Sequence, residues 1–157
     1  MKNEVRIIGG QWKRSKLPVT DAPGLRPTPD RVRETLFNWL GQDLSGWRVL
    51  DAFAGSGALG FEAASRGAAE VVLLERSAVL ARALAASKAR LHADALQVHA
   101  VDALAWMMSA ARRLRPVRSE GLGRALDARA SHLRARARAA DAILAPTRYA
   151  ADRALEW

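Results

Sequence analysis

The sequence predicts an α/β fold in which helices wind around a parallel sheet. Between residues 48 and 110, three apolar strand-like segments alternate with three helix-like segments. Such β-α repeats form parallel sheets with right-handed crossovers. A glycine-rich turn joins the first strand to the first helix of this series, and a hairpin and a helix precede it. The length of 157 residues suits one domain with its own core.

The first predicted element is a β-hairpin. Residues 5–8 and 11–17 form its arms, and Gly9 and Gly10 supply the positive φ angles that a turn requires. Residues 18–27 are rich in Pro and Gly and are expected to form a connector.

A helix is predicted to follow the connector. Thr28 is expected as its N-cap, Pro29 in its first turn, and Asp30 where a negative charge complements the helix dipole. Its core-facing stripe is predicted from apolar side chains at helical spacing, namely Val32, Leu36, Trp39 and Leu40.

The β-α series then begins. The predicted order is strand 48–53, helix 58–66, strand 71–74, helix 78–92, strand 96–101 and helix 103–110. Gly67 ends the first helix, and Ser77 caps the second. Because the strands are parallel, their carboxyl ends share one edge, where ligands bind in such folds.

The turn at 51–60 carries the strongest functional signal. Gly55 and Gly57 allow a tight turn and close approach to a ligand, and Gly60 allows the helix to pack against the strand. Glu75 ends the second strand, where its carboxylate can accept hydrogen bonds from both hydroxyls of a ribose. Taken alone, the glycines could serve only the turn, and Glu75 could be a solvated strand end.

Asp51 selects among nucleotide-like ligands. A carboxylate at the tip of the first strand repels a dinucleotide pyrophosphate but attracts the ammonium and sulfonium of S-adenosylmethionine. Asp102, after the third strand, can meet the adenine amine or simply cap the following helix. The residues predicted to bind S-adenosylmethionine are Asp51, Phe53, Ala54, Gly55, Ser56, Gly57, Glu75, Arg76, Asp102 and Ala103.

Composition narrows the other functional classes. The chain has no Cys and three scattered His, so no metal site is expected. A polar start and the lack of a long apolar run favour a cytoplasmic protein without a membrane span. The net charge of +9 favours a polyanionic partner. The candidate RNA-binding residues are Arg6, Trp12, Lys13, Arg14, Lys16, Arg26 and Arg33, with a solvated hairpin face as the alternative.

Residues 4–108 resemble the bacterial small-subunit ribosomal RNA guanine-N2 methyltransferase family. The matching stretches are Arg6-Ile-Ile-Gly-Gly-Gln-Trp12, Arg26-Pro27-Thr28, Arg33-Glu34-Thr-Leu-Phe37-Asn38-Trp-Leu40, and Val49-Leu-Asp51 through Gly67-Ala68. The resemblance implies a Rossmann-like class I methyltransferase with an N-terminal hairpin and helix that help to grip RNA and donor. It also implies methyl transfer from S-adenosylmethionine to the exocyclic N2 of a guanine in 16S rRNA, free or within a small-subunit assembly particle.

The C-terminal third departs from that family. The expected Asp/Asn-Pro-Pro-Tyr/Phe motif, which aligns the target amine and stacks on the flipped base, is absent, so no catalytic residue is assigned. Residues 111–140 contain nine Arg and eight Ala. They fit a basic amphipathic helix, a disordered Arg-rich tail, or out-of-frame translation that returns to frame near 142–157. Without a fourth strand, Val49, Leu50 and Phe53 are expected to form an uncovered apolar edge.

The expected organisation has three parts: an RNA- and donor-gripping segment at 1–45, donor-binding βα units at 46–110, and the Arg/Ala-rich remainder at 111–157. An rRNA methyltransferase with impaired turnover is the leading hypothesis. A non-catalytic RNA-binding protein that keeps the donor-site fold is the second, and a dinucleotide oxidoreductase, disfavoured by Asp51, is the third.

Overall fold

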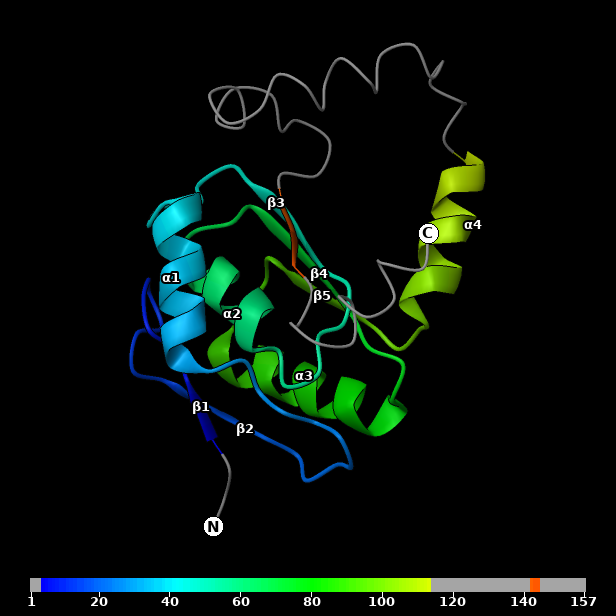
Figure 1. Cartoon of the computed structure of the whole chain (residues 1–157), viewed down its shortest axis with the longest axis horizontal. Coiled ribbons are helices and arrows are strands. Elements are labelled where there is room, and N and C mark those ends of the chain that lie inside the picture. Colours follow the sequence, from blue (N-terminus) through cyan, green and yellow to red (C-terminus); the bar gives the residue numbers. More distant parts are fainter. Residues whose placement is uncertain (1–3, 114–141, 145–157) are drawn as a thin grey trace.

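A four-stranded parallel sheet forms the centre of the molecule, with strand order β5-β4-β3-β6 (Figure 1). The computed structural model describes residues 4–113 and 142–144. The strands are β3 (Arg48–Asp51), β4 (Glu70–Leu74), β5 (Leu96–His99) and β6 (Ala142–Leu144). The chain moves outward from β3 to β5 and then returns to β6 on the other side of β3. The strand order therefore reverses at β3, the position where doubly wound folds bind ligands.

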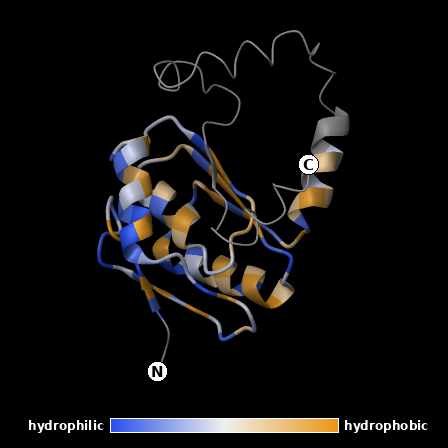
Figure 2. Ribbon diagram, in the orientation of Figure 1, coloured by the Kyte–Doolittle hydropathy of each residue, from blue (hydrophilic) through white to orange (hydrophobic). Residues whose placement is uncertain are grey.

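Helices cover both faces of the sheet. Three helices, α1 (Asp30–Leu40), α2 (Ala58–Ser65) and α3 (Ala78–Leu91), pack on one face, and α4 (Ala103–Arg113) packs on the other (Figure 1). The alternation of side chains along each strand separates two cores. Val49, Val71 and Leu73 belong to the larger core under α1–α3, whereas Leu74 packs toward Ala103 of α4. Figure 2 shows apolar residues concentrated in the strands and α2. The predicted Rossmann-like α/β class is confirmed.

The expected uncovered edge of β3 is a prediction that the structure corrects. β6 pairs in parallel with β3, with Val49 opposite Ala142 and Asp51 opposite Leu144. The segment 142–144 therefore covers this edge from Val49 to Asp51, and Phe53 lies beyond the pairing. The alternatives for 111–140 lie outside the described residues, apart from 111–113, which extend α4.

The N-terminal hairpin is present but its loop is longer than predicted. β1 (Glu4–Arg6) pairs antiparallel with β2 (Lys16–Pro18), so only the end of the predicted second arm is a strand. Residues 7–15 form a folded loop instead, because their backbone groups bond to α2: the Gln11 N–H donates to the Ser65 carbonyl at 2.7 Å.

The predicted apolar stripe of α1 is confirmed for Leu36 and Leu40, which pack against the core, and is wrong for Val32 and Trp39. Arg33 and Phe37 are the buried residues of this helix, whereas Val32 and Trp39 are 41% and 79% exposed. Thr28 makes no capping hydrogen bond with its side chain, and Pro29 occupies the N-cap position. The helix is turned because Arg33 forms a fully buried ion pair with α2, which periodicity of apolar residues cannot reveal.

Candidate functional site

The glycine-rich loop leaves β3 and enters α2 at the carboxyl edge of the sheet. Gly55 and Gly57 have φ angles of 53° and 77°, in the region that favours glycine. A Cβ on Gly57 would lie 2.6 Å from Cδ2 of Leu84. A Cβ on Gly60 would collide with the Leu73 side chain, in agreement with its interpretation as a helix–strand packing position. The loop conformation therefore depends on glycine at these positions.

Asp51 is buried with one oxygen left without a partner. Its side chain is 1% exposed, and its Oδ2 accepts a hydrogen bond from the Gly60 N–H at 3.1 Å. Within the described part of the chain, Oδ1 has no hydrogen-bond partner. Burial raises the pKa of Asp51 to about 7; the backbone N–H groups of Gly60 and Phe53 oppose this shift, and the charge of Glu75 adds to it. A buried unpaired oxygen is costly unless a ligand satisfies it.

A hollow lies directly beside Asp51. The glycine loop forms one wall, and the connector before α1 forms the other. The lining residues are Leu25, Arg26, Pro27, Thr28, Asp51, Phe53, Ala54, Gly55, Ser56, Ala58 and Leu59. Asp51 and Arg26 thus bring opposite charges to one small space.

The connector wall is the part of the site that sequence reasoning missed. Leu25 lines this hollow and also a neighbouring one that includes Leu80 and Leu84 of α3. The Cδ1 atom of Leu25 lies 3.0 Å from the position of a Cβ on Gly55. The Pro-rich composition of residues 18–27 identified a connector, but no local signal showed that it packs on the glycine loop.

Glu75 is engaged by backbone groups on both sides of the β4–α3 turn. Its Oε2 accepts from the Gly55 N–H at 2.9 Å and its Oε1 from the Ser77 N–H at 2.7 Å. The half-buried carboxylate therefore fixes the glycine loop to the end of β4, and it is not a freely solvated strand end. Each carboxylate oxygen can accept a second hydrogen bond, so the group keeps capacity for ligand hydroxyls.

Asp102 begins α4 and caps it. Its exposed side chain accepts a hydrogen bond from the Ala105 N–H at 3.0 Å through Oδ1. Ala103 is buried against Leu74, and Arg76 is exposed after β4. Asp51 thus ends β3, while Glu75 and Asp102 follow β4 and β5, so the three carboxylates lie at one edge of three neighbouring strands.

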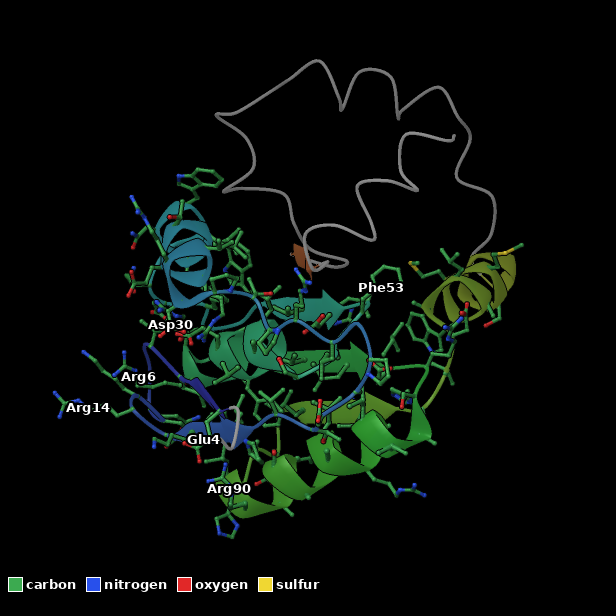
Figure 3. The ribbon with its side chains drawn as sticks, turned by 60° about the horizontal axis from the view of Figure 1, so that its bottom comes forward. Glu4, Arg6, Arg14, Asp30, Phe53 and Arg90 are labelled. Atoms are coloured by element: carbon green, nitrogen blue, oxygen red, sulfur yellow. The ribbon has the colours of Figure 1, made fainter. Side chains whose placement is uncertain are left out.

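Most candidate RNA-binding residues gather at the other end of α2. The Trp12 N–H donates to Oγ of Ser65 at 3.0 Å. Ser65 is the last residue of this eight-residue helix, whose length is about 12 Å at the usual rise. Arg6 and Arg14 accordingly lie on the opposite side of the molecule from Phe53 (Figure 3).

These residues differ in how far they are available to a partner. Lys13 and Arg14 are exposed, whereas the Trp12 ring is half-buried against the core. Arg6 lies 3.6 Å from Asp30, and Lys16 pairs with Glu4 at 2.8 Å. Arg26 stands apart from them because it lines the hollow beside Asp51.

Arg33 is corrected as an RNA-binding candidate. Its side chain is 0% exposed and forms a buried ion pair with Glu62, so it offers no surface to RNA.

Neither a membrane-spanning helix nor a metal-binding cluster is found among the described residues. No helix in residues 4–113 is long and apolar enough to cross a membrane. Within the same described residues, no three acidic, His or Cys side chains gather in a manner that could hold a metal ion.

Comparison with known proteins places the chain in one family. The family described as conserved hypothetical protein 95 matches residues 5–116. The ribosomal RNA small subunit methyltransferase D of Escherichia coli is 51% identical over 104 residues, which cover 66% of this chain and 52% of that protein. The protein of the same name from Haemophilus influenzae is 57% identical over 83 residues, covering 53% and 43%. The chain thus spans about half the length of the curated relatives that it matches.

Solved structures give the same result for the fold. A structure from Escherichia coli named as a putative methyltransferase has a TM-score of 0.61 and 46% identity, covering 66% of this chain and 56% of that one. A hypothetical protein of Thermus thermophilus has a TM-score of 0.58 and 35% identity, covering 69% and 62%.

Proposed function

The chain belongs to the conserved hypothetical protein 95 family, and from this membership we propose that it is the donor-binding part of a methyltransferase that modifies ribosomal RNA. The proposed donor is S-adenosylmethionine, and the proposed acceptor is the exocyclic N2 of a guanine in 16S rRNA, free or within a small-subunit particle. The observation that carries the proposal is the buried Oδ1 of Asp51 beside the glycine loop, which has no hydrogen-bond partner among the described residues.

The charges of the hollow suit the amino-acid end of this donor. The methionine part of S-adenosylmethionine carries an ammonium and a carboxylate, and the hollow offers Asp51 to the first and Arg26 to the second. A dinucleotide would instead place a pyrophosphate near Asp51, where the like charges repel. Gly55 and Gly57 allow the backbone to approach the ligand, while Glu75 and Asp102 would receive the ribose hydroxyls and the adenine amine. This fit supports a sulfonium donor over a phosphate-linked one.

The proposed division of labour follows from what the chain contains. S-adenosylmethionine supplies an electrophilic methyl group when bound. The residues of the glycine loop, the connector and the three strand ends bind and orient that donor. The Asp/Asn-Pro-Pro-Tyr/Phe motif that would align the acceptor amine is absent from the sequence. We therefore expect donor binding to be retained and methyl transfer by the 157-residue chain to be impaired.

The proposed organisation keeps the three segments 1–45, 46–110 and 111–157. The second candidate function, non-catalytic RNA binding, draws support from the exposed Lys13 and Arg14 at the far end of α2. It predicts salt-sensitive RNA binding without methyl transfer.

Titration calorimetry with S-adenosylmethionine and with NADH tests the donor proposal. We expect a single site for S-adenosylmethionine and none for NADH. The reverse selectivity would refute the assignment.

Transfer of labelled methyl groups to 30S-derived RNA tests the second step, with the full-length Escherichia coli relative as the positive control. We expect the relative to label the RNA and the present chain to label it far less. Equal labelling would contradict the expected impairment.

A further inference from the structure

Arg33 is a buried cation in which Nε, Nη1 and Nη2 all have hydrogen-bond partners. Its guanidinium donates to three groups: Nε to the Thr28 carbonyl at 3.2 Å, Nη1 to Oε2 of Glu62 at 3.1 Å, and Nη2 to Oδ1 of Asp30 at 2.5 Å. The side chain is 0% exposed. A planar guanidinium can hold several acceptors in a fixed arrangement, which an ammonium cannot do.

Two partners of Arg33 lie on the two elements that flank the hollow beside Asp51, the connector and α2. Thr28 ends the connector wall and lines the hollow together with Arg26. Glu62 lies in α2, the helix that continues directly from the glycine-loop wall. The Arg33 side chain therefore joins the connector to α2, in addition to the packing of Leu25 on the glycine loop.

We propose that Arg33 is a positioning residue for donor binding, which holds the connector residues 25–28 against the glycine loop. Its action is indirect, through Thr28, and it does not touch the donor. This inference rests on the proposed donor site. It assigns a function to a residue that was predicted to bind RNA because of its charge. It also explains why an arginine occupies the core-facing side of α1.

Arg66 offers a matched control inside the same network. It donates to the other oxygen of Glu62, with Nε at 3.0 Å and Nη2 at 2.9 Å, and it is 6% exposed. Its side chain also contacts the Gln42 side chain and the Phe37 ring, which lie outside the connector and the glycine loop. Arg33→Lys and Arg66→Lys thus each remove a guanidinium that bonds to the Glu62 carboxylate, but only Arg33 also bonds to the connector.

The experiment compares the two variants in the complete chain by calorimetric titration with S-adenosylmethionine. If the connector of Arg33→Lys packs on the glycine loop about one tenth of the time, the Kd of this variant for S-adenosylmethionine rises about tenfold. Arg66→Lys is expected to keep the wild-type Kd within about twofold, since its connector stays packed on the loop. The folded fraction of each variant is measured by thermal denaturation and used to correct the titrations.

Hydrogen exchange of the unliganded proteins gives a reading that needs no donor. Residues 18–28 should exchange faster in Arg33→Lys than in Arg66→Lys, while β4 and β5 exchange equally in both. Equal exchange of the connector in the two variants, or an equal rise in Kd, would overturn the positioning role. If the wild-type chain fails to bind S-adenosylmethionine, the proposed function falls, and faster exchange in Arg33→Lys alone would still support the contact between the walls.

Discussion

Charged side chains gather at both ends of α2, but their hydrogen bonding differs between the two ends. At its C-terminal end, Glu62 is fully buried and accepts hydrogen bonds from the backbone of Ile8 and Gly9 and from the guanidinium groups of Arg33 and Arg66. At its N-terminal end, Asp51 is equally buried but has one oxygen without a partner in the described structure.

This difference separates the structural carboxylate of Glu62 from the carboxylate for which we propose a ligand. The Glu62 cluster satisfies its charges internally, so it joins the N-terminal hairpin, α1 and α2 and has no capacity left for a ligand. Among the described residues, Asp51 keeps an unsatisfied acceptor beside a hollow. This acceptor costs stability unless a ligand supplies a hydrogen-bond donor. Burial alone therefore does not distinguish the two roles, whereas the hydrogen-bond inventory does.

Removing the charge of Glu62 is expected to have the largest effect on stability. Glu62→Gln leaves two buried guanidinium groups without their shared anion, and breaking a buried pair costs about 3–5 kcal/mol. Urea denaturation measures this loss. The control is Glu70→Gln, since Glu70 pairs with Arg48 at 2.8 Å on the surface and such pairs contribute below about 1 kcal/mol. Equal losses in the two variants would contradict the structural role of the cluster.

Asp51→Asn, unlike Glu62→Gln, should increase the stability of the fold at neutral and higher pH. The folded-state pKa of Asp51 is about 7, above its ordinary value of 3.8. Protonation therefore stabilises the fold below about pH 4, and this contribution is lost as the pH rises through 7. The variant does not titrate at this position, so at pH 8 it should exceed the wild type by up to about 4 kcal/mol. Denaturation at pH 4 and pH 8 measures the difference.

The same substitution should abolish the attraction for a donor ammonium. Because the ionised carboxylate binds the cation, wild-type affinity for S-adenosylmethionine should rise between pH 6 and pH 8. Asp51→Asn should bind weakly at every pH. A variant that binds the donor as well as the wild type would show that Asp51 is only a structural group.

The sequence predicted the sheet and the glycine loop because both depend on local patterns. Alternating apolar segments place β3, β4 and β5, and the glycines at 55 and 57 mark a turn with positive φ. Asp102 was expected either as a ligand or as a cap, and the cap is present while the ligand role stays a prediction.

The features that the sequence could not predict depend on long-range partners. Arg33 turns inward because Glu62, 29 residues away, lies opposite it. Leu25 reaches the donor hollow because the connector folds back over Gly55. Neither contact produces a periodic pattern of apolar residues in the sequence. Helical spacing alone therefore assigned Trp39 to the core, although it is 79% exposed.

The smallest effect on the fold is expected at the surface of the far end of α2. Lys13→Gln removes an exposed charge, so stability should stay within about 0.5 kcal/mol and donor affinity should not change. If Lys13 contacts an RNA phosphate, the slope of log affinity against log salt should fall by about one. Arg82→Gln, an equal loss of charge at an exposed position on α3, should leave that slope unchanged. Equal slopes for both variants and the wild type would mean that Lys13 belongs only to a solvated surface. A shift in donor affinity for Lys13→Gln would mean that the two ends of α2 do not act separately.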